Sequence, residues 1–180
     1  VNLFVGELLN NKSINLDKKV SYYLPKIGSG YANAKVQDVL NMNVINAYTE
    51  DYTKAYSSSF LHEPVGGWRL PKNSDKHLSQ EDYLNTIKSK KNRNLKNKSN
   101  LAFYKSANTD VVGLIVEKIS GKPLRHWMLR AVEAAGFEEG IYIASDRYGM
   151  PWMSGGGCLI TRDFLRMGLL FARKGKGVGK

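Results

Sequence analysis

The sequence predicts a mostly α-helical fold with little β-structure. Several segments carry apolar residues at helical spacing between recognisable start and stop signals, whereas only one short segment alternates as a strand does. Of the 180 residues, 42% are hydrophobic, which is enough for a real core. We see no internal repeat, and we therefore expect residues 1–180 to form a single globular unit.

The first 42 residues predict three helical elements. A helix over 1–10 places Val1, Phe4, Val5 and Leu8 on one stripe. A turn of helix follows and stops at Pro25, and a further helix covers 34–42. Because the chain begins with Val in the middle of a helical pattern, we expect an incomplete chain.

Residues 43–78 show no sustained periodicity. Aromatic side chains are spread there among Ser, Gly and Pro residues: Tyr48, Tyr52, Tyr56, Phe60 and Trp68. A long irregular segment of this kind is more typical of a functional loop than of an inert connection.

The second half predicts three more helices and one short strand. One helix covers 79–88 behind the N-cap Ser79, one covers about 109–120, and one lies between Pro123 and Gly136. A short strand is expected in 140–149 and a glycine-rich passage in 149–160. A last helix starts with Thr161 as its cap and Asp163 in its first turn.

Much of the net charge of +11, which gives a pI near 9.7, lies in one segment. Residues 88–98 carry five Lys and one Arg and no acid. A solvated segment is favoured over an anion-binding patch, since interleaved aromatic residues are absent, and we expect no nucleic-acid partner. No apolar run reaches the roughly 18 to 20 residues of a membrane-spanning helix, and the first residues lack the pattern of a signal peptide.

Metal and redox chemistry have little support in the sequence. The single Cys158 excludes an internal disulfide, and we expect it to be a buried structural thiol. The three histidines, His62, His77 and His126, lie apart without metal-ligand spacing, so we expect them to be structural or exposed. We expect no metal and no cofactor.

The stretch Tyr104, Lys105, Ser106 lies directly ahead of the apolar helical pattern. A ring projecting from a segment held by a buried helix is well mounted for catalysis. A tyrosine with a pKa near 10 needs a neighbouring cation to act as a base near neutral pH, and Lys105 would point to the other side of an extended segment. From these residues alone, a packed aromatic is favoured over a catalytic Tyr104.

Four segments stand out by their order and spacing: 8–25, 34–44, 104–124 with its Tyr-x-Ser motif, and 149–176 with its glycine-rich turn. Together they resemble serine hydrolases of the penicillin-binding-protein and class C β-lactamase type. Within that family the chain most resembles the esterase and 6-aminohexanoate-dimer hydrolase branch. The resemblance implies the helical subdomain of an α/β, β-lactamase-like fold, with the main sheet largely missing.

The resemblance implies an acyl-enzyme mechanism on a small-molecule ester, amide or β-lactam. Tyr104 would be the proton-transfer residue, and Ser106 would bond to the catalytic Lys or to the substrate. Segment 43–78 would cover the substrate, with Tyr52 either in contact with it or merely packed. Trp152 and Gly156 either line the cleft or shape a turn. Glu50 and Asp51 are a possible carboxylate pair, but we favour a solvated turn.

Two motifs of the family are absent. No serine in the chain has Lys three positions later, and no Lys-Thr-Gly or His-x-Gly follows 149–176. We therefore expect a nucleophile upstream of Val1, a chain cut at both ends, and no acyl transfer by these 180 residues alone.

Several alternatives stay open. The chain could be a non-catalytic module that binds peptidoglycan or another anionic polymer through 88–98, or a structural piece whose apolar face packs on a missing sheet. Substrate and oligomeric state are undetermined. Location is open too, since bacterial relatives occur both exported and cytoplasmic.

Overall fold

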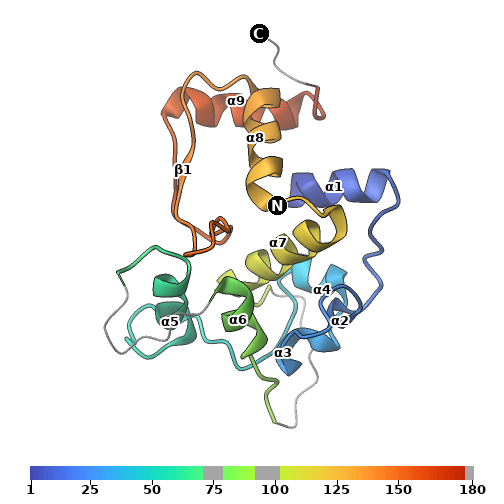
Figure 1. The fold of residues 1–180 in the computed structure, drawn as a ribbon, viewed down its shortest axis with the longest axis vertical. Helices are drawn as coiled ribbons and strands as arrows, with labels where there is room; N and C mark the ends of the chain where they lie inside the picture. Colours follow the sequence, from blue (N-terminus) through green and yellow to red (C-terminus); the bar gives the residue numbers. More distant parts are fainter. Residues whose placement is uncertain (71–78, 92–101, 177–180) are drawn as a thin grey trace.

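The computed structural model describes residues 1–70, 79–91 and 102–176 (Figure 1). Within these ranges the chain forms nine helices and one antiparallel pair of two-residue strands. The helices are α1 (Asn2–Asn10), α2 (Val20–Tyr23), α3 (Ser29–Ala32), α4 (Val36–Leu40), α5 (Ser58–Val65), α6 (Gln80–Asn85), α7 (Ser106–Ser120), α8 (Leu124–Ala135) and α9 (Thr161–Ala172). The strands are β1 (Tyr142–Ile143) and β2 (Gly157–Cys158).

Helix α7 is the centre of the fold, and Figure 1 shows α1, α4, α6 and α8 arranged around it. Residues on all its faces are buried between Ser106 and Val116, as expected for a helix enclosed by neighbours on every side. It ends at Gly121, whose left-handed backbone (φ +63°) suits glycine. The Glu117 carboxylate then accepts a hydrogen bond from the Leu124 amide at 2.9 Å, which ties α7 to the start of α8.

The main core gathers apolar side chains from α1, α2, α4, α6 and α7. Its fully buried members include Val20, Val36, Val39, Val44, Leu84, Val111, Ile115 and Leu124. A smaller cluster of Ala135, Phe137 and Leu170 joins α8 to α9. The buried Asp163 accepts the amide protons of Glu138 and Glu139 at 2.8 and 3.0 Å, so its carboxylate fixes the connection that follows α8.

The structure confirms the helices expected in 1–10, around 20–24, in 34–42, in 79–88 and between Pro123 and Gly136. Ser79 caps α6 as expected, and Asp82 completes a capping box with it. Helices α3 and α5 and strand β2 were not anticipated, so 43–78 is not wholly irregular. Residues 71–78 of that segment lie outside the described residues.

Three local expectations were wrong. Helix α7 begins at Ser106 rather than near 109. Ile160, not Thr161, is the N-cap residue of α9, and Thr161 already has helical backbone. Cys158 is exposed rather than buried, because it lies on strand β2, both of whose residues are exposed.

Some expectations fall wholly or partly beyond the described ranges. His77 and residues 92–98 of the basic segment lie there, so the solvated-segment and anion-binding interpretations both stay predictions. In the part of the chain that the structure does describe, no helix has the length and apolar character needed to cross a membrane.

Candidate functional site

The backbone turns from extended to helical at Lys105, the N-cap residue of α7 (φ −149°, ψ 121°). Successive side chains of an extended segment point to opposite sides, and here they do: Tyr104 is 56% exposed, whereas Lys105 is 3% exposed. The expectation that Lys105 points away from Tyr104 is confirmed. Tyr104 therefore stands at the surface on the rigid start of a buried helix.

Glu50 caps this helix from a distant part of the chain. Its carboxylate accepts hydrogen bonds from the Ser106 amide at 3.0 Å and from the Ser106 hydroxyl at 2.5 Å. The first amides of a helix lack intrahelical partners and carry partial positive charge, so a carboxylate is favourable there. No side chain of the N-cap residue itself serves that role. The solvated-turn interpretation was wrong for Glu50.

Tyr52 joins the same carboxylate. Its hydroxyl donates to Glu50, while most of its ring stays exposed. Partial desolvation, reinforced by the bond to Glu50, raises the pKa of Tyr52 to about 12. Glu50 thus brings together two residues singled out from the sequence, Tyr52 and Ser106, next to Tyr104.

Asp51, beside Glu50, has a separate and local role. Its carboxylate accepts bonds from the Thr53 amide at 3.1 Å and the Thr53 hydroxyl at 2.7 Å, and pairs with Lys54 at 3.0 Å. The hydrogen bonds from Thr53, followed by that from Lys54, lower the pKa of Asp51 to about 2. Asp51 shapes the turn and does not pair with Glu50.

Lys105 anchors the segment that carries Glu50. Its ammonium group donates to the Tyr48 carbonyl at 2.7 Å and lies 5.3 Å from the centre of the Phe103 ring. Burial, followed by the nearby Lys90, lowers the pKa of Lys105 to about 8, against the opposing effect of Glu50. Two contacts, Lys105 to Tyr48 and Ser106 to Glu50, thus hold residues 48–50 against the start of α7.

Trp152 and Gly156 flank Ser154, which contacts α7 one turn after Ser106. Trp152 is 7% exposed, and its ring packs edge-on against His62 and at a tilt against Trp68. Gly156 has φ +73°, and a side chain there would place its Cβ 2.9 Å from the Trp68 ring. The residue between them, Ser154, donates its amide to Asp110 of α7 at 3.1 Å. Since Asp110 follows Ser106 by four residues, both positions share one face of the helix.

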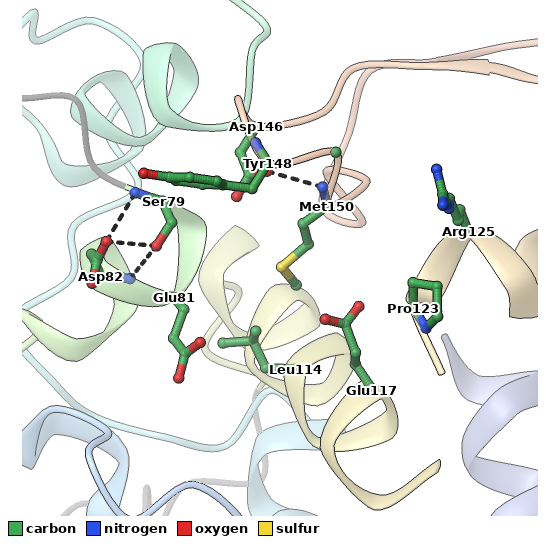
Figure 2. A pocket seen from close by; sticks show the side chains of 11 residues that line it. Ser79, Glu81, Asp82, Leu114, Glu117, Pro123, Arg125, Asp146, Tyr148 and Met150 are labelled. Atoms are coloured by element: carbon green, nitrogen blue, oxygen red, sulfur yellow. Dashed lines mark hydrogen bonds between the residues drawn. The ribbon is translucent and has the colours of Figure 1, made fainter. Parts of the chain in front are cut away.

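A separate cavity of about 400 Å³ opens between α6, α7 and the 146–150 turn (Figure 2). Three of its carboxylates already hold backbone amides or caps: Asp82 bonds with Ser79, Glu117 with Leu124, and Asp146 with residues 80, 148 and 150. Its lining includes none of the site residues expected from the sequence. The described residues also contain no cluster of His, Cys, Asp and Glu suited to a metal ion.

Comparisons with known proteins show relatives in sequence and in fold. No family model matches the chain. It is 29% identical, over 97% of its own length, to 6-aminohexanoate-dimer hydrolase of Paenarthrobacter ureafaciens, and it spans 43% of that protein. It therefore covers less than half of the curated relative.

Solved structures show the same fold at lower identity. A Bacillus anthracis protein described as a 6-aminohexanoate-dimer hydrolase superposes with a TM-score of 0.77 at 21% identity, over 98% of this chain and 46% of that one. A D-stereospecific amidohydrolase from Streptomyces sp. gives 0.58 at 16% identity, over 93% and 56%. D-amino acid amidase from Ochrobactrum anthropi SV3 gives 0.54 at 17%, over 94% and 53%.

Replacing Glu50 by glutamine tests the cap. The amide side chain keeps the shape of the carboxylate but loses the charge and one acceptor, and hydrogen bonds to a charged group contribute about 1.5–3 kcal/mol. We expect the Ser106 amide to exchange with solvent at least tenfold faster in the Glu50→Gln variant. Asp51→Asn, one residue away, is the matched control and should leave Ser106 unchanged. Equal Ser106 exchange in Glu50→Gln and the unmodified chain would contradict the cap.

Proposed function

We propose that the chain carries the Tyr-bearing helical part of a serine hydrolase for small amides, within the hydrolase family related to β-lactamases and penicillin-binding proteins, to which its similarity to 6-aminohexanoate-dimer hydrolase assigns it. The observation that carries the proposal is the mounting of Tyr104. Its ring is exposed at the start of the most deeply buried helix, beside a Ser106 that Glu50 fixes through two hydrogen bonds.

In the proposed mechanism, a serine attacks the amide carbonyl and forms an acyl-enzyme. Tyr104 moves the proton between that serine and the leaving amine, a role that needs a hydroxyl within hydrogen-bond reach of both. Ser106, oriented by Glu50, offers an oxygen lone pair to a catalytic lysine or to the substrate. Tyr52 lies on the segment that covers the substrate.

The nucleophile is not among the residues of this chain in the form that the family uses. No serine of the 180 is followed three positions later by lysine. The proposal therefore needs a Ser-x-x-Lys helix, and the α/β sheet behind it, from residues other than these 180. The chain's coverage of 43% of the curated relative leaves room for both.

A small amide is the substrate class that we favour over an ester or a β-lactam. Both named groups of relatives support it: one is a hydrolase of 6-aminohexanoate dimer, and the solved structures include a D-amino acid amidase. Water then releases the acyl group as a carboxylic acid.

The first test uses the 180-residue chain itself. Treated with a fluorophosphonate probe, it is expected to keep its mass of 20.2 kDa, because the serine that would take the adduct is missing. A stoichiometric adduct, or a burst of product from an activated ester, would show that a serine of this chain is the nucleophile and would overturn the proposed division of roles.

The second test supplies the missing parts. A chimera in which the chain replaces the matching segment of the Paenarthrobacter ureafaciens hydrolase should cleave 6-aminohexanoate dimer or D-phenylalanine amide. Tyr104→Phe in it should lower kcat by about 10²–10⁴, the range of positioned proton transfer. Tyr142→Phe, on the exposed strand β1, is the control. A folded, active chimera that tolerates Tyr104→Phe would refute the role of Tyr104.

A further inference from the structure

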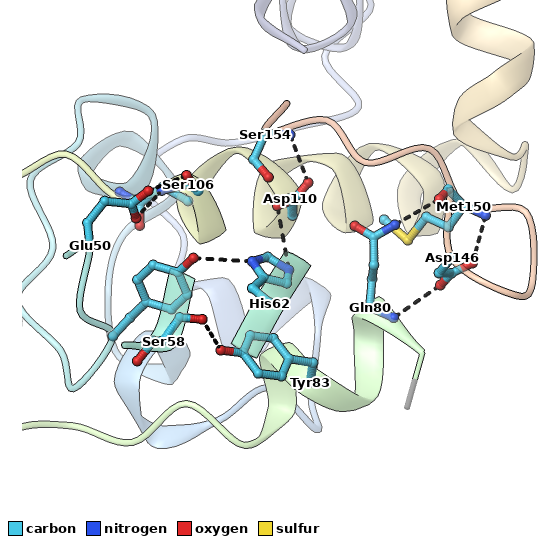
Figure 3. Close-up of polar contacts among 12 residues, drawn as sticks. Glu50, Ser58, His62, Gln80, Tyr83, Ser106, Asp110, Asp146, Met150 and Ser154 are labelled. Carbon is cyan, nitrogen blue, oxygen red and sulfur yellow. Dashed lines mark hydrogen bonds and ion pairs between the residues drawn. The ribbon is translucent and has the colours of Figure 1, made fainter. Parts of the chain in front are cut away.

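Three buried polar side chains from three segments meet beneath the candidate site (Figure 3). His62 of α5 and Asp110 of α7 have no exposed surface, and Tyr48 is 2% exposed. The Nδ1 atom of His62 lies 3.3 Å from the Tyr48 hydroxyl, and its Nε2 atom lies 3.8 Å from Oδ2 of Asp110. His62 therefore lies between Asp110 of α7 and the hydroxyl of Tyr48 and contacts both.

Aromatic rings surround His62 and bury its imidazole. The Tyr83 ring stacks on the imidazole at 4.6 Å, and Trp152 covers it edge-on at 5.9 Å. Nε2 of His62 and Oδ2 of Asp110 lie 3.8 Å apart, and among the described residues neither atom has a hydrogen-bond partner. Two buried polar atoms left in this way are costly unless a proton lies between them.

Burial and the charge of Glu50 disfavour an ionised Asp110, and the hydrogen bonds from Ser154 and the Met153 backbone oppose them. The titratable groups that surround it are Glu50 and the phenols of Tyr31, Tyr48 and Tyr83. Burial raises the pKa of Asp110 to about 7, against hydrogen bonds from Ser154, and burial lowers the pKa of His62 to about 4. Below neutral pH the proton of the pair therefore belongs on the carboxyl group.

We propose that Asp110 is a carboxylic acid that donates its proton to Nε2 of a neutral His62, so that Nδ1–H of His62 donates to the Tyr48 hydroxyl. His62 is then a positioning residue for residues 47–50, called the Glu50 segment below. The Nε2 to Oδ2 separation must close by about 1 Å to reach hydrogen-bond length. The other oxygen of Asp110 already accepts the Ser154 amide, which leaves Oδ2 to carry the proton.

The pair acts on the candidate site through the backbone of Tyr48. Its hydroxyl is held by His62, its carbonyl by Lys105, and Glu50 follows two residues later to cap α7 at Ser106. The catalytic relevance of this placement rests on the proposed function. The proton arrangement itself does not rest on the proposed function, and its test does not require the protein to be an active hydrolase.

Nuclear magnetic resonance of the 180-residue chain, with ¹⁵N-labelled histidine and ¹³C-labelled aspartate, tests the proton arrangement. At pH 6 we expect a neutral His62 ring protonated at Nδ1, and an Asp110 carboxyl resonance that titrates near pH 7. Asp110→Asn should keep the same His62 tautomer, because its amide group can donate to Nε2 in place of the acid. An imidazolium ring at pH 6, or a neutral ring protonated at Nε2, would overturn the proposal.

Hydrogen exchange tests the positioning. Tyr48→Phe keeps the ring but removes the hydroxyl that His62 holds, and we expect the Ser106 amide to exchange roughly fivefold faster or more, the effect of one lost hydrogen bond. Tyr83→Phe is the matched control, since its hydroxyl donates to the Ser58 carbonyl instead of to His62. Unchanged Ser106 exchange in Tyr48→Phe, or equal acceleration in both variants, would contradict the positioning role. An inactive chimera would contradict the proposed function, but it would not change the conclusion drawn from the resonance or the exchange measurements.

Discussion

Replacing Gly28 by alanine is expected to lower the free energy of unfolding by about 3 kcal/mol, the upper end of what overpacking usually costs. A Cβ at this position would lie 2.2 Å from the Ile87 carbonyl oxygen and 2.7 Å from that of Asn85. Both are backbone atoms, so neither can move aside as a flexible side chain would. Either α3 or the segment after α6 has to shift.

That shift would reach the candidate site, because the segment after α6 lies between α3 and the Glu50 segment. The Ile87 carbonyl accepts the Gly30 amide at 2.9 Å, and the Lys88 carbonyl accepts the Ala47 amide at 2.8 Å. Displacing residues 87 and 88 therefore loosens the start of the Glu50 segment as well. We expect faster exchange of the Ser106 amide in Gly28→Ala, together with the lower stability.

Gly6→Ala is the matched control for this prediction. Gly6 lies on the exposed side of α1, and a Cβ there would meet nothing within 4 Å. Alanine should stabilise the helix by about 0.5–1 kcal/mol, because glycine has the lower helix propensity. Urea unfolding of both variants measures the difference. A Gly28→Ala protein as stable as Gly6→Ala would show that α3 and residues 85–87 do not pack as described.

The sequence predicted the helices whose start and stop signals lie within a few residues of their own ends. In α6, Ser79 and Asp82 are three residues apart and form the capping box directly, and α8 lies between Pro123 and Gly136. Helix α5 was missed, because its serine-rich start and Pro64 favour a turn locally. A side-chain cap by Ser57 and the tertiary contacts of the buried His62 hold it.

The start of α7 shows why a candidate site is harder to predict than a helix. No capping side chain stands at the N-cap position, because the cap is Glu50, which is 56 residues away in sequence. The pairing of His62 with Asp110 also joins residues far apart in the sequence and leaves no spacing to recognise. Tyr104 and Ser106 were predicted through a family resemblance, whereas the contacts that hold them become visible only in the folded chain.

The largest pH effect is expected in Asp110→Asn, and its sign follows from where the pair keeps its proton. In the folded chain, the pKa of Asp110 is raised from 3.8 to about 7, and the pKa of His62 is lowered from 6.5 to about 4. Between pH 4 and 6.5 the folded pair therefore holds one proton, on Asp110. The unfolded chain also holds one, on His62. Equal proton numbers mean that the pair contributes no pH dependence of stability in this window.

Asparagine at position 110 breaks that balance. The folded variant keeps His62 neutral above pH 4, while the unfolded variant still protonates it below 6.5, so the unfolded state binds one more proton. Stability then rises with pH by about 1.4 kcal/mol per unit, or roughly 3 kcal/mol across the window, relative to the unmodified chain. The effect is fully present near pH 4 and vanishes above 6.5.

Urea unfolding at pH 4.5, 5.5 and 6.5 measures this difference, because comparing two variants cancels the titration of all other groups. Glu139→Gln removes an exposed carboxylate and should run parallel to the unmodified chain, whereas Asp110→Asn should diverge from it towards acid pH. If Asp110→Asn also runs parallel, burial does not depress the pKa of His62, and the neutral imidazole that holds Tyr48 has no basis. If it diverges, the fold itself maintains a histidine that stays neutral where an exposed one would be charged, directly behind the segment that carries Glu50.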